Sequence, residues 1–142
     1  VVGAGYWGPN LARNFSASGV WDLRWVCDLN TDRARRIAGY GTRVCEDVAE
    51  VISDPQVHAV AIATPASTHC AIALEAIEAG KHVLIEKPLA STYADGEKVV
   101  EAASRRGVVL MCDHTYCYTP AVECLRPTVP IRSGRVRRVS RI

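Results

Sequence analysis

The sequence contains no long apolar run, no internal repeat and no low-complexity segment. Its longest apolar segments, residues 57–63 and 108–112, are far shorter than the roughly 20 residues with which an apolar helix crosses a bilayer. A membrane span is therefore excluded. A length of 142 residues with 49% hydrophobic and 23% charged residues is instead typical of one globular domain.

An excess of charge of one sign is also missing, since 17 Lys and Arg face 15 Asp and Glu. Binding to nucleic acid depends on clustered basic residues rather than on the total. Six arginines follow the last acidic residue, Glu123: Arg126, Arg132, Arg135, Arg137, Arg138 and Arg141. Arginine alternates with valine in residues 135–139, which fits a half-exposed strand better than a helix along phosphates. We therefore expect no nucleic-acid partner.

The six cysteines form no C-x-x-C pair, and no histidine pair completes the spacing of a zinc site. We therefore expect no metal. No secretory segment opens the sequence, so the cysteines are expected to be buried thiols in a reducing cytoplasm. Because the chain begins with Val1 and reaches its first glycine at position 3, we expect it to be truncated at the front.

Between residue 1 and about residue 109, short apolar runs alternate with longer segments of helical period. This alternation is typical of βαβ units on a parallel sheet. The predicted strands are residues 1–2, 23–27, 42–45, 57–63, 82–86 and 108–112, and the predicted helices are residues 9–16, 31–38, 47–53, 67–79 and 91–105. The fold class is therefore α/β, a doubly wound parallel sheet with residues 57–63 at its centre.

Residue types at the helix ends support these boundaries. Thr31 and Ser91 are expected to be N-caps. Glycines are expected to follow the helices in left-handed conformation, at Gly19, Gly39, Gly80 and Gly107. In the helix over residues 91–105, the side expected to face the sheet carries Tyr93, Gly96, Val100 and Ala103.

The first predicted strand runs directly into Gly3-Ala4-Gly5-Tyr6-Trp7-Gly8, which fits the G-x-G-x-x-G pattern of dinucleotide-binding turns. Gly3 permits a tight turn, Gly5 lets the backbone approach a pyrophosphate, and Gly8 lets the helix pack close to the strand. The helix N-terminus then attracts the phosphates. The sequence therefore predicts a dinucleotide at this turn.

Asp28 follows Gly8 by the 20 positions at which the pattern requires an acidic residue for the adenosine ribose. A carboxylate there repels a 2′-phosphate, which favours NAD over NADP. Arg33, Arg35 and Arg36 weaken that preference, although arginines on a helix more often form a solvated face.

Ligands of such sheets gather beyond the carboxyl ends of the strands. Three predicted strand ends carry reactive side chains: Thr64-Pro65 with His69, Glu86-Lys87-Pro88, and Asp113-His114-Thr115-Tyr116. Pro88 disfavours the helical region for Lys87 and so keeps its ammonium near the sheet edge. There Lys87 either takes part in proton transfer or hydrogen-bonds a substrate hydroxyl; a solvated lysine at a strand end is the alternative.

Several motifs together resemble the N-terminal half of the glucose-fructose oxidoreductase, inositol dehydrogenase and MocA family. The glycine motif, Thr64-Pro65 with Thr68-His69, and residues 114–122 all match it. The most specific match is Glu86-Lys87-Pro88-Leu89 after the strand entry at residues 79–83. Residues 114–122 look most like the branch that contains sugar 3-dehydrogenases and deoxysugar ketoreductases.

The resemblance implies an NAD(P)-dependent oxidoreductase that moves a hydride between nicotinamide and a sugar or polyol carbon. Lys87 is then the catalytic residue and Tyr116 contacts substrate. His114 either contacts substrate or orders its own loop. The implied cofactor-binding residues are Gly3, Gly5, Tyr6, Trp7, Gly8, Asp28, Thr64, Pro65, His69, Glu86 and Lys87. Asp113 replaces a usual glycine and Thr119 a usual asparagine, which affects the expected substrate contacts.

Members of this family are more than twice as long and carry a second α+β domain, which supplies a catalytic histidine and builds homo-oligomers. We therefore expect residues 1–118 to form the NAD(P)-binding domain. Residues 119–142 are expected to be a linker and the first strand of the otherwise absent second domain. The alternative function is a catalytically incomplete fragment that only binds the dinucleotide.

Overall fold

The computed structural model describes residues 1–125 of the chain and shows five strands, six α-helices and one 3-10 helix within them. In chain order, the elements are α1 (Gly8–Ala17), β1 (Trp25–Cys27), α2 (Thr31–Ile37), β2 (Arg43–Cys45), α3 (Val48–Ser53), β3 (Ala59–Ile62), α4 (Ala66–Glu78), β4 (His82–Glu86), α5 (Tyr93–Arg106), β5 (Leu110–Asp113), η1 (Thr115–Tyr118) and α6 (Pro120–Leu125). Strands and helices alternate from α1 to β5, as predicted.

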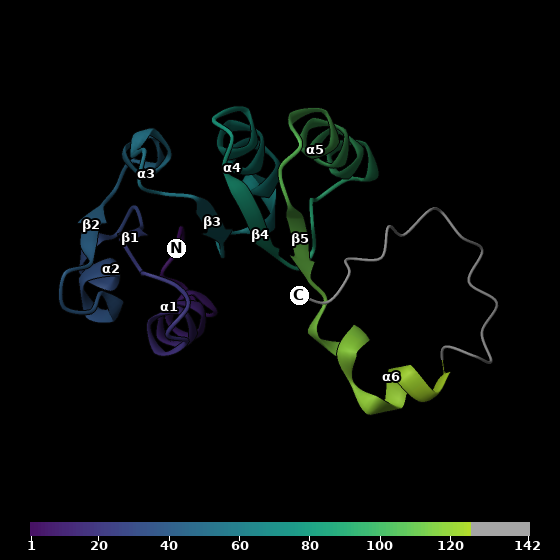
Figure 1. Cartoon of the computed structure of the whole chain (residues 1–142), viewed down its shortest axis with the longest axis horizontal. Coiled ribbons are helices and arrows are strands. Elements are labelled where there is room, and N and C mark those ends of the chain that lie inside the picture. The colour runs from purple at the N-terminus through teal and green to yellow at the C-terminus, as the bar shows by residue number, and fades with distance from the viewer. Residues whose placement is uncertain (126–142) are drawn as a thin grey trace.

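All strand pairs are parallel, and one residue joins two groups of strands into a single sheet. The β1–β2 pair forms one group and β3–β4–β5 the other. Val2 bridges Cys27 of β1 on one side and Ile62 of β3 on the other. The order across the sheet is therefore β2, β1, the Val2 segment, β3, β4 and β5, with the N-terminus between β1 and β3 (Figure 1).

Helices lie on both faces of the sheet, with α3, α4 and α5 on one face and α1 and α2 on the other (Figure 1). The main core lies beneath α3, α4 and α5, where Val60, Ile62, Ile77 and Ile85 are almost completely buried. The sheet is therefore doubly wound, and the fold class predicted from the sequence is confirmed.

The structure corrects several predicted details. Val2 forms two isolated bridges, and residues 1–2 do not form a strand. The strands β1, β3 and β5 begin two residues later than predicted. Gly19, Gly80 and Gly107 have positive φ, but near the α2 end Gly41 rather than Gly39 takes that conformation. The N-caps are Asn30 and Thr92, one residue from the predicted positions.

The predicted buried side of α5 is partly wrong. Tyr93 and Val100 are 82% and 51% exposed, whereas Val99, Ala102 and Ala103 are buried. The buried face of the helix is therefore centred on Val99. The helix α6 was not predicted, and the strand expected over residues 135–142 lies outside the described residues.

Candidate active site

Gly3 and Gly5 lie in the tight turn between Val2 and α1, Gly8 is the first residue of α1, and each of these motif glycines has a different environment. Gly3 has φ +97°, and a Cβ there would lie 2.7 Å from the Ala63 backbone. A Cβ on Gly8 would lie 2.0 Å from the Gly3 carbonyl oxygen. These two glycines are needed for the turn itself, because any larger side chain would meet backbone atoms that cannot move aside.

Gly5 differs because a Cβ built on it has no atom within 4 Å. The space above Gly5 is therefore open, and its glycine is not required by protein packing. The turn leads into the N-terminus of α1, where Pro9 occupies the first turn. The first turn of a helix leaves backbone N–H groups without intrahelical partners. Open space beside such N–H groups fits a phosphate-bearing ligand.

Asp28 directly follows β1, and its carboxylate ties the glycine turn to that strand. One oxygen accepts a 2.6 Å hydrogen bond from the Ala4 amide, and the other accepts a 2.8 Å bond from the Asn30 amide. Each carboxylate oxygen has a second lone pair, so Asp28 can still accept hydroxyl donors. The hydrogen bond to the turn gives Asp28 a positioning role that its spacing in the sequence did not reveal.

A cleft of about 250 Å³ brings together residues from three separate segments of the chain. Its lining residues are Gly5, Tyr6, Trp7, Ala63, Thr64, Pro65, Glu86 and Lys87. The first three come from the glycine turn, the next three follow β3, and the last two end β4. All of them except Ala63 were predicted from the sequence to bind the cofactor.

The aromatic residues Tyr6 and Trp7 line the turn side of this cleft. Their rings meet edge to face with centroids 5.7 Å apart, and they are 88% and 43% exposed. On the other side of the cleft, the Lys87 side chain directly follows β4 and is exposed. The cleft therefore presents an aromatic pair and an ammonium group at the carboxyl edge of the sheet.

Glu86 is the buried acidic residue of the cleft, with 7% of its surface exposed. Burial is the main cause that raises the pKa of its carboxyl, and the neighbouring charge of Asp113 raises it further. The backbone N–H and the ammonium of Lys87 act in the opposite direction. Glu86 therefore keeps its proton to higher pH than an ordinary glutamate.

His69 lies beneath the cleft rather than in it. Its side chain is 1% exposed, and its ring nitrogens lie 2.8 Å from the Pro88 carbonyl and 2.9 Å from the Thr64 carbonyl. The ring thus connects the segments that follow β3 and β4. The buried His69 ring therefore holds the Thr64 and Pro88 carbonyls, and His69 does not line the cleft.

The predicted substrate residues lie apart from these side chains. His114 is exposed just after β5, and Tyr116 in η1 is 80% exposed. Neither residue lines the cleft. The structure therefore brings the predicted cofactor residues together, but it leaves His114 and Tyr116 on the adjoining surface.

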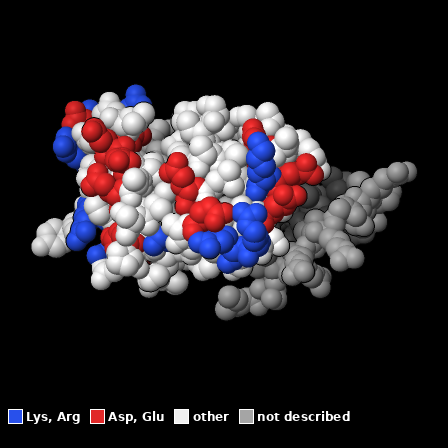
Figure 2. Space-filling view, turned by 90° about the horizontal axis from the view of Figure 1, so that it is seen from above, with Lys and Arg blue, Asp and Glu red and all other residues white. Residues whose placement is uncertain are grey.

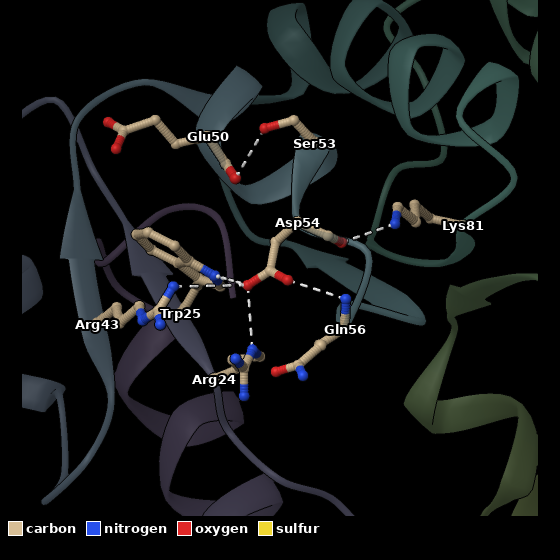
Figure 3. A network of polar contacts seen from close by, with 8 residues as sticks. All are labelled: Arg24, Trp25, Arg43, Glu50, Ser53, Asp54, Gln56 and Lys81. Carbon is tan, nitrogen blue, oxygen red and sulfur yellow. Dashed lines mark hydrogen bonds and ion pairs between the residues drawn. The ribbon is translucent and has the colours of Figure 1, made fainter.

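A network around Asp54, which sequence reasoning missed, connects the loop after α3 to three other segments (Figure 3). One carboxylate oxygen accepts hydrogen bonds from Arg24 Nε at 3.0 Å and Trp25 Nε1 at 2.8 Å, and Arg43 lies 3.9 Å away. The buried Lys81 donates to the Asp54 carbonyl at 2.9 Å. These partners are distant in sequence, so no local pattern indicated the network.

A larger hollow of about 860 Å³ lies where the strands begin, away from the glycine turn. Apolar side chains such as Phe15, Val57 and Leu84 line much of it. No residue of the glycine turn or of the Glu86-Lys87 segment contributes to it. The larger hollow therefore contains none of the residues that the sequence predicted to bind cofactor or substrate.

Charges of both signs alternate over the face formed by α3, α4 and α5 (Figure 2). Glu78 of α4 pairs with Arg105 and Arg106 of α5, and Asp95 pairs with Lys98.

None of the described helices is both long and apolar enough to cross a membrane. Within residues 1–125, no three His, Cys, Asp or Glu side chains cluster as metal ligands would.

Known proteins are similar to this chain in sequence and in fold. Residues 1–114 match the model of the oxidoreductase family with an NAD-binding Rossmann fold, GFO_IDH_MocA. The chain is 37% identical over 112 residues to levoglucosan dehydrogenase of Pseudarthrobacter phenanthrenivorans, covering 79% of this chain and 28% of that protein. It is 35% identical over 127 residues to UDP-N-acetylglucosamine 3-dehydrogenase of Acidithiobacillus ferrooxidans, covering 89% and 39%.

Among solved structures, GenD2 from gentamicin A biosynthesis, crystallised in complex with NAD, superposes with a TM-score of 0.83. It is 36% identical, and the match covers 92% of this chain and 38% of GenD2. The chain thus spans about a third of the length of such relatives. The chain therefore belongs to the GFO_IDH_MocA oxidoreductase family and contains its NAD-binding Rossmann domain.

Proposed function

We propose that the chain is the dinucleotide-binding part of an NAD-dependent dehydrogenase that acts on a hydroxyl group of a sugar or polyol. The observation that carries this proposal is the open space above Gly5, beside the N-terminus of α1 and next to the Lys87 strand end. The names of its relatives, which include sugar and polyol dehydrogenases, support the substrate class.

In this function, Asp28 accepts hydrogen bonds from the adenosine ribose, and the turn over Gly3–Gly8 holds the diphosphate. The Asp28 carboxylate favours NAD over NADP, because a 2′-phosphate there would meet a like charge. Among the α2 arginines, Arg35 is paired with Asp32 at 2.9 Å. That pair partly neutralises the positive charge which would otherwise attract a 2′-phosphate.

NAD, when bound, supplies the nicotinamide carbon that accepts or returns the hydride. Lys87 is the residue we assign to the substrate oxygen. In the reducing direction its ammonium donates a hydrogen bond to the carbonyl oxygen and gives it a proton as the hydride reaches the carbon; in the oxidising direction its neutral amine takes the hydroxyl proton. Tyr6 and Trp7 exclude water from the turn side of the cleft. His69 supports Lys87 from below through the Pro88 carbonyl.

The binding step is tested by titrating NADH into the chain and into the variant Gly5→Ala. A methyl group on Gly5 meets no protein atom within 4 Å, so the fold and its Tm should be unchanged. The methyl group does occupy the space assigned to the diphosphate, so NADH binding should weaken by about tenfold or more, equivalent to about 1.4 kcal/mol.

The matched control is Gly96→Ala in α5, where a Cβ has an ordinary 3.7 Å contact with Leu89. This change lies outside the cleft and should leave NADH affinity unchanged. Equal affinity in the parent chain and in Gly5→Ala would contradict the proposed diphosphate position.

A second candidate function is dinucleotide binding without turnover, and the match to only 28% and 39% of the two dehydrogenases favours it for the isolated chain. Both functions predict NADH binding. Only the first predicts that NAD is reduced when sugars or polyols are added, which is measured by the appearance of NADH absorbance.

A further inference from the structure

Two carboxyl side chains end neighbouring strands at the edge of the candidate site. Glu86 at the end of β4 and Asp113 at the end of β5 are partners in the parallel register. Neighbouring strands lie about 4.8 Å apart, and paired residues present their side chains to the same face of a sheet. The two carboxyl groups therefore lie side by side, with Glu86 buried and Asp113 partly exposed.

Other contacts hold the two carboxyl groups in this arrangement. The Thr115 hydroxyl donates a 3.0 Å hydrogen bond to one oxygen of Asp113. Around Glu86, the charged and titratable neighbours are Asp113 and Cys112 on β5 and Lys87 on its own strand. Lys87 is the cation of this group, and it is exposed.

Protonation of this pair is coupled. Burial and the charge of Asp113 both raise the pKa of the Glu86 carboxyl, and the two acidic groups together with burial also raise the pKa of the Cys112 thiol. Two carboxyl groups in contact do not both ionise readily, and their protons belong to the pair rather than to either residue. The Glu86 carboxyl therefore keeps its proton to higher pH than a glutamate without these surroundings would.

We propose that Glu86 and Asp113 form a proton-sharing pair that makes the choice between oxidised and reduced nicotinamide cofactor depend on pH, with Asp113 as a positioning residue. The inference rests on the proposed function. If Asp28 holds the adenosine ribose and the glycine turn holds the diphosphate, the nicotinamide half extends toward the ends of β3 and β4. Glu86 lines the cleft at that end.

The direction of the effect follows from charge. The oxidised nicotinamide ring is positively charged and the reduced ring is neutral. At low pH Glu86 carries its proton and favours the neutral ring; once Glu86 ionises at higher pH, its negative charge favours the cation. Binding of the oxidised cofactor therefore releases a proton, and its affinity relative to NADH increases with pH by up to about tenfold per pH unit.

The experiment measures the dissociation constants of NAD and NADH between about pH 5 and pH 9 for the chain, for Asp113→Asn and for the control Asp22→Asn. Asp22 is exposed and lies outside the cleft. The ratio of the two constants should depend on pH in the chain and in Asp22→Asn, and much less in Asp113→Asn. The same slope in all three proteins, or no slope in the parent chain, would overturn the proposal.

A second measurement does not require the cofactor. Carboxyl ¹³C chemical shifts report the titration of Glu86 directly, and the midpoint should fall in Asp113→Asn while it stays unchanged in Asp22→Asn. An unchanged midpoint in Asp113→Asn would overturn the shared proton even if both cofactors bind. Failure of the chain to bind either cofactor, with a normal Glu86 response, would instead contradict the proposed function and the cofactor part of this inference.

Discussion

At the residue scale, the three motif glycines show how one pattern combines different physical requirements. Gly3 and Gly8 face backbone atoms at distances that exclude a Cβ, whereas Gly5 faces open space. The spacing in the sequence predicted all three positions, and the reasons given for Gly3 and Gly5 agree with these surroundings. The sequence did not show that Asp28 also fastens the turn through the Ala4 amide, because that contact depends on where β1 ends.

Asp54 provides a prediction about pH. Hydrogen bonds from Trp25, from the Gln56 amide and from Arg24 hold the pKa of its carboxyl at about 2, below its ordinary value of 3.8. A lowered pKa stabilises the fold above the ordinary value, and this stabilisation is lost as pH falls through the folded pKa. Asp54→Asn should therefore lower the Tm at neutral pH, and the difference from the parent chain should shrink between about pH 4 and pH 2.

The control for this comparison is Asp32→Asn, which removes an exposed pair with Arg35. Exposed ion pairs contribute about 0–1 kcal/mol, so the Tm should change little. Thermal melts followed by circular dichroism at several pH values give the comparison. A Tm difference for Asp54→Asn that stays constant down to pH 2 would argue against this role of the carboxylate.

At the element scale, substitutions before α5 can show which residue caps its N-terminus. The Thr92 hydroxyl oxygen accepts a 3.1 Å hydrogen bond from the Asp95 amide, while the sequence pattern had indicated Ser91. Thr92→Ala should destabilise the chain by about 1 kcal/mol, the usual cost of losing such a cap. Ser91→Ala removes the neighbouring hydroxyl and should be nearly neutral. Denaturant unfolding of both variants checks the prediction, and equal losses would contradict the assignment.

The helices and strands themselves were largely predictable, whereas their ends and faces were less so. Apolar runs and glycines follow local rules of backbone conformation, which is why β4 has the predicted bounds. The buried face of α5 depends on the angle at which the helix meets α4 and the sheet, and neighbouring residues in the sequence do not encode that angle. Helical spacing alone assigned Tyr93 and Val100 to the side facing the sheet, and both are exposed.

At the scale of the whole molecule, the site could be predicted to the extent that it follows from topology. Strand ends in a parallel sheet meet at one edge, so Thr64, Glu86 and Lys87 were expected together, and they line one cleft. The burial of His69 and the pairing of Glu86 with Asp113 depend on packing depth and strand register. Neither is visible in residue types or spacing.

The sheet has two halves, and the segment around Val2 hydrogen-bonds to both. The Gly3 amide donates to the Cys27 carbonyl of β1 at 2.7 Å, and the Ala63 amide donates to the Val2 carbonyl at 2.8 Å. A dinucleotide that extends from Asp28 to Lys87 would contact both halves, so its binding energy should oppose their separation. Exchange of the Gly3 and Ala63 amides should therefore slow together when NADH is added.

At an NADH concentration about 100 times its dissociation constant, exchange that requires unfolding should slow by about 100-fold, equivalent to about 2.7 kcal/mol. Hydrogen exchange followed by NMR measures the two amides separately. In Gly5→Ala, the same NADH concentration should give much less protection, because the diphosphate position is occupied by a methyl group. Protection limited to β1 and β2 would mean that the ligand contacts the adenosine half alone, and the assignment of Lys87 to the reacting end would then be wrong.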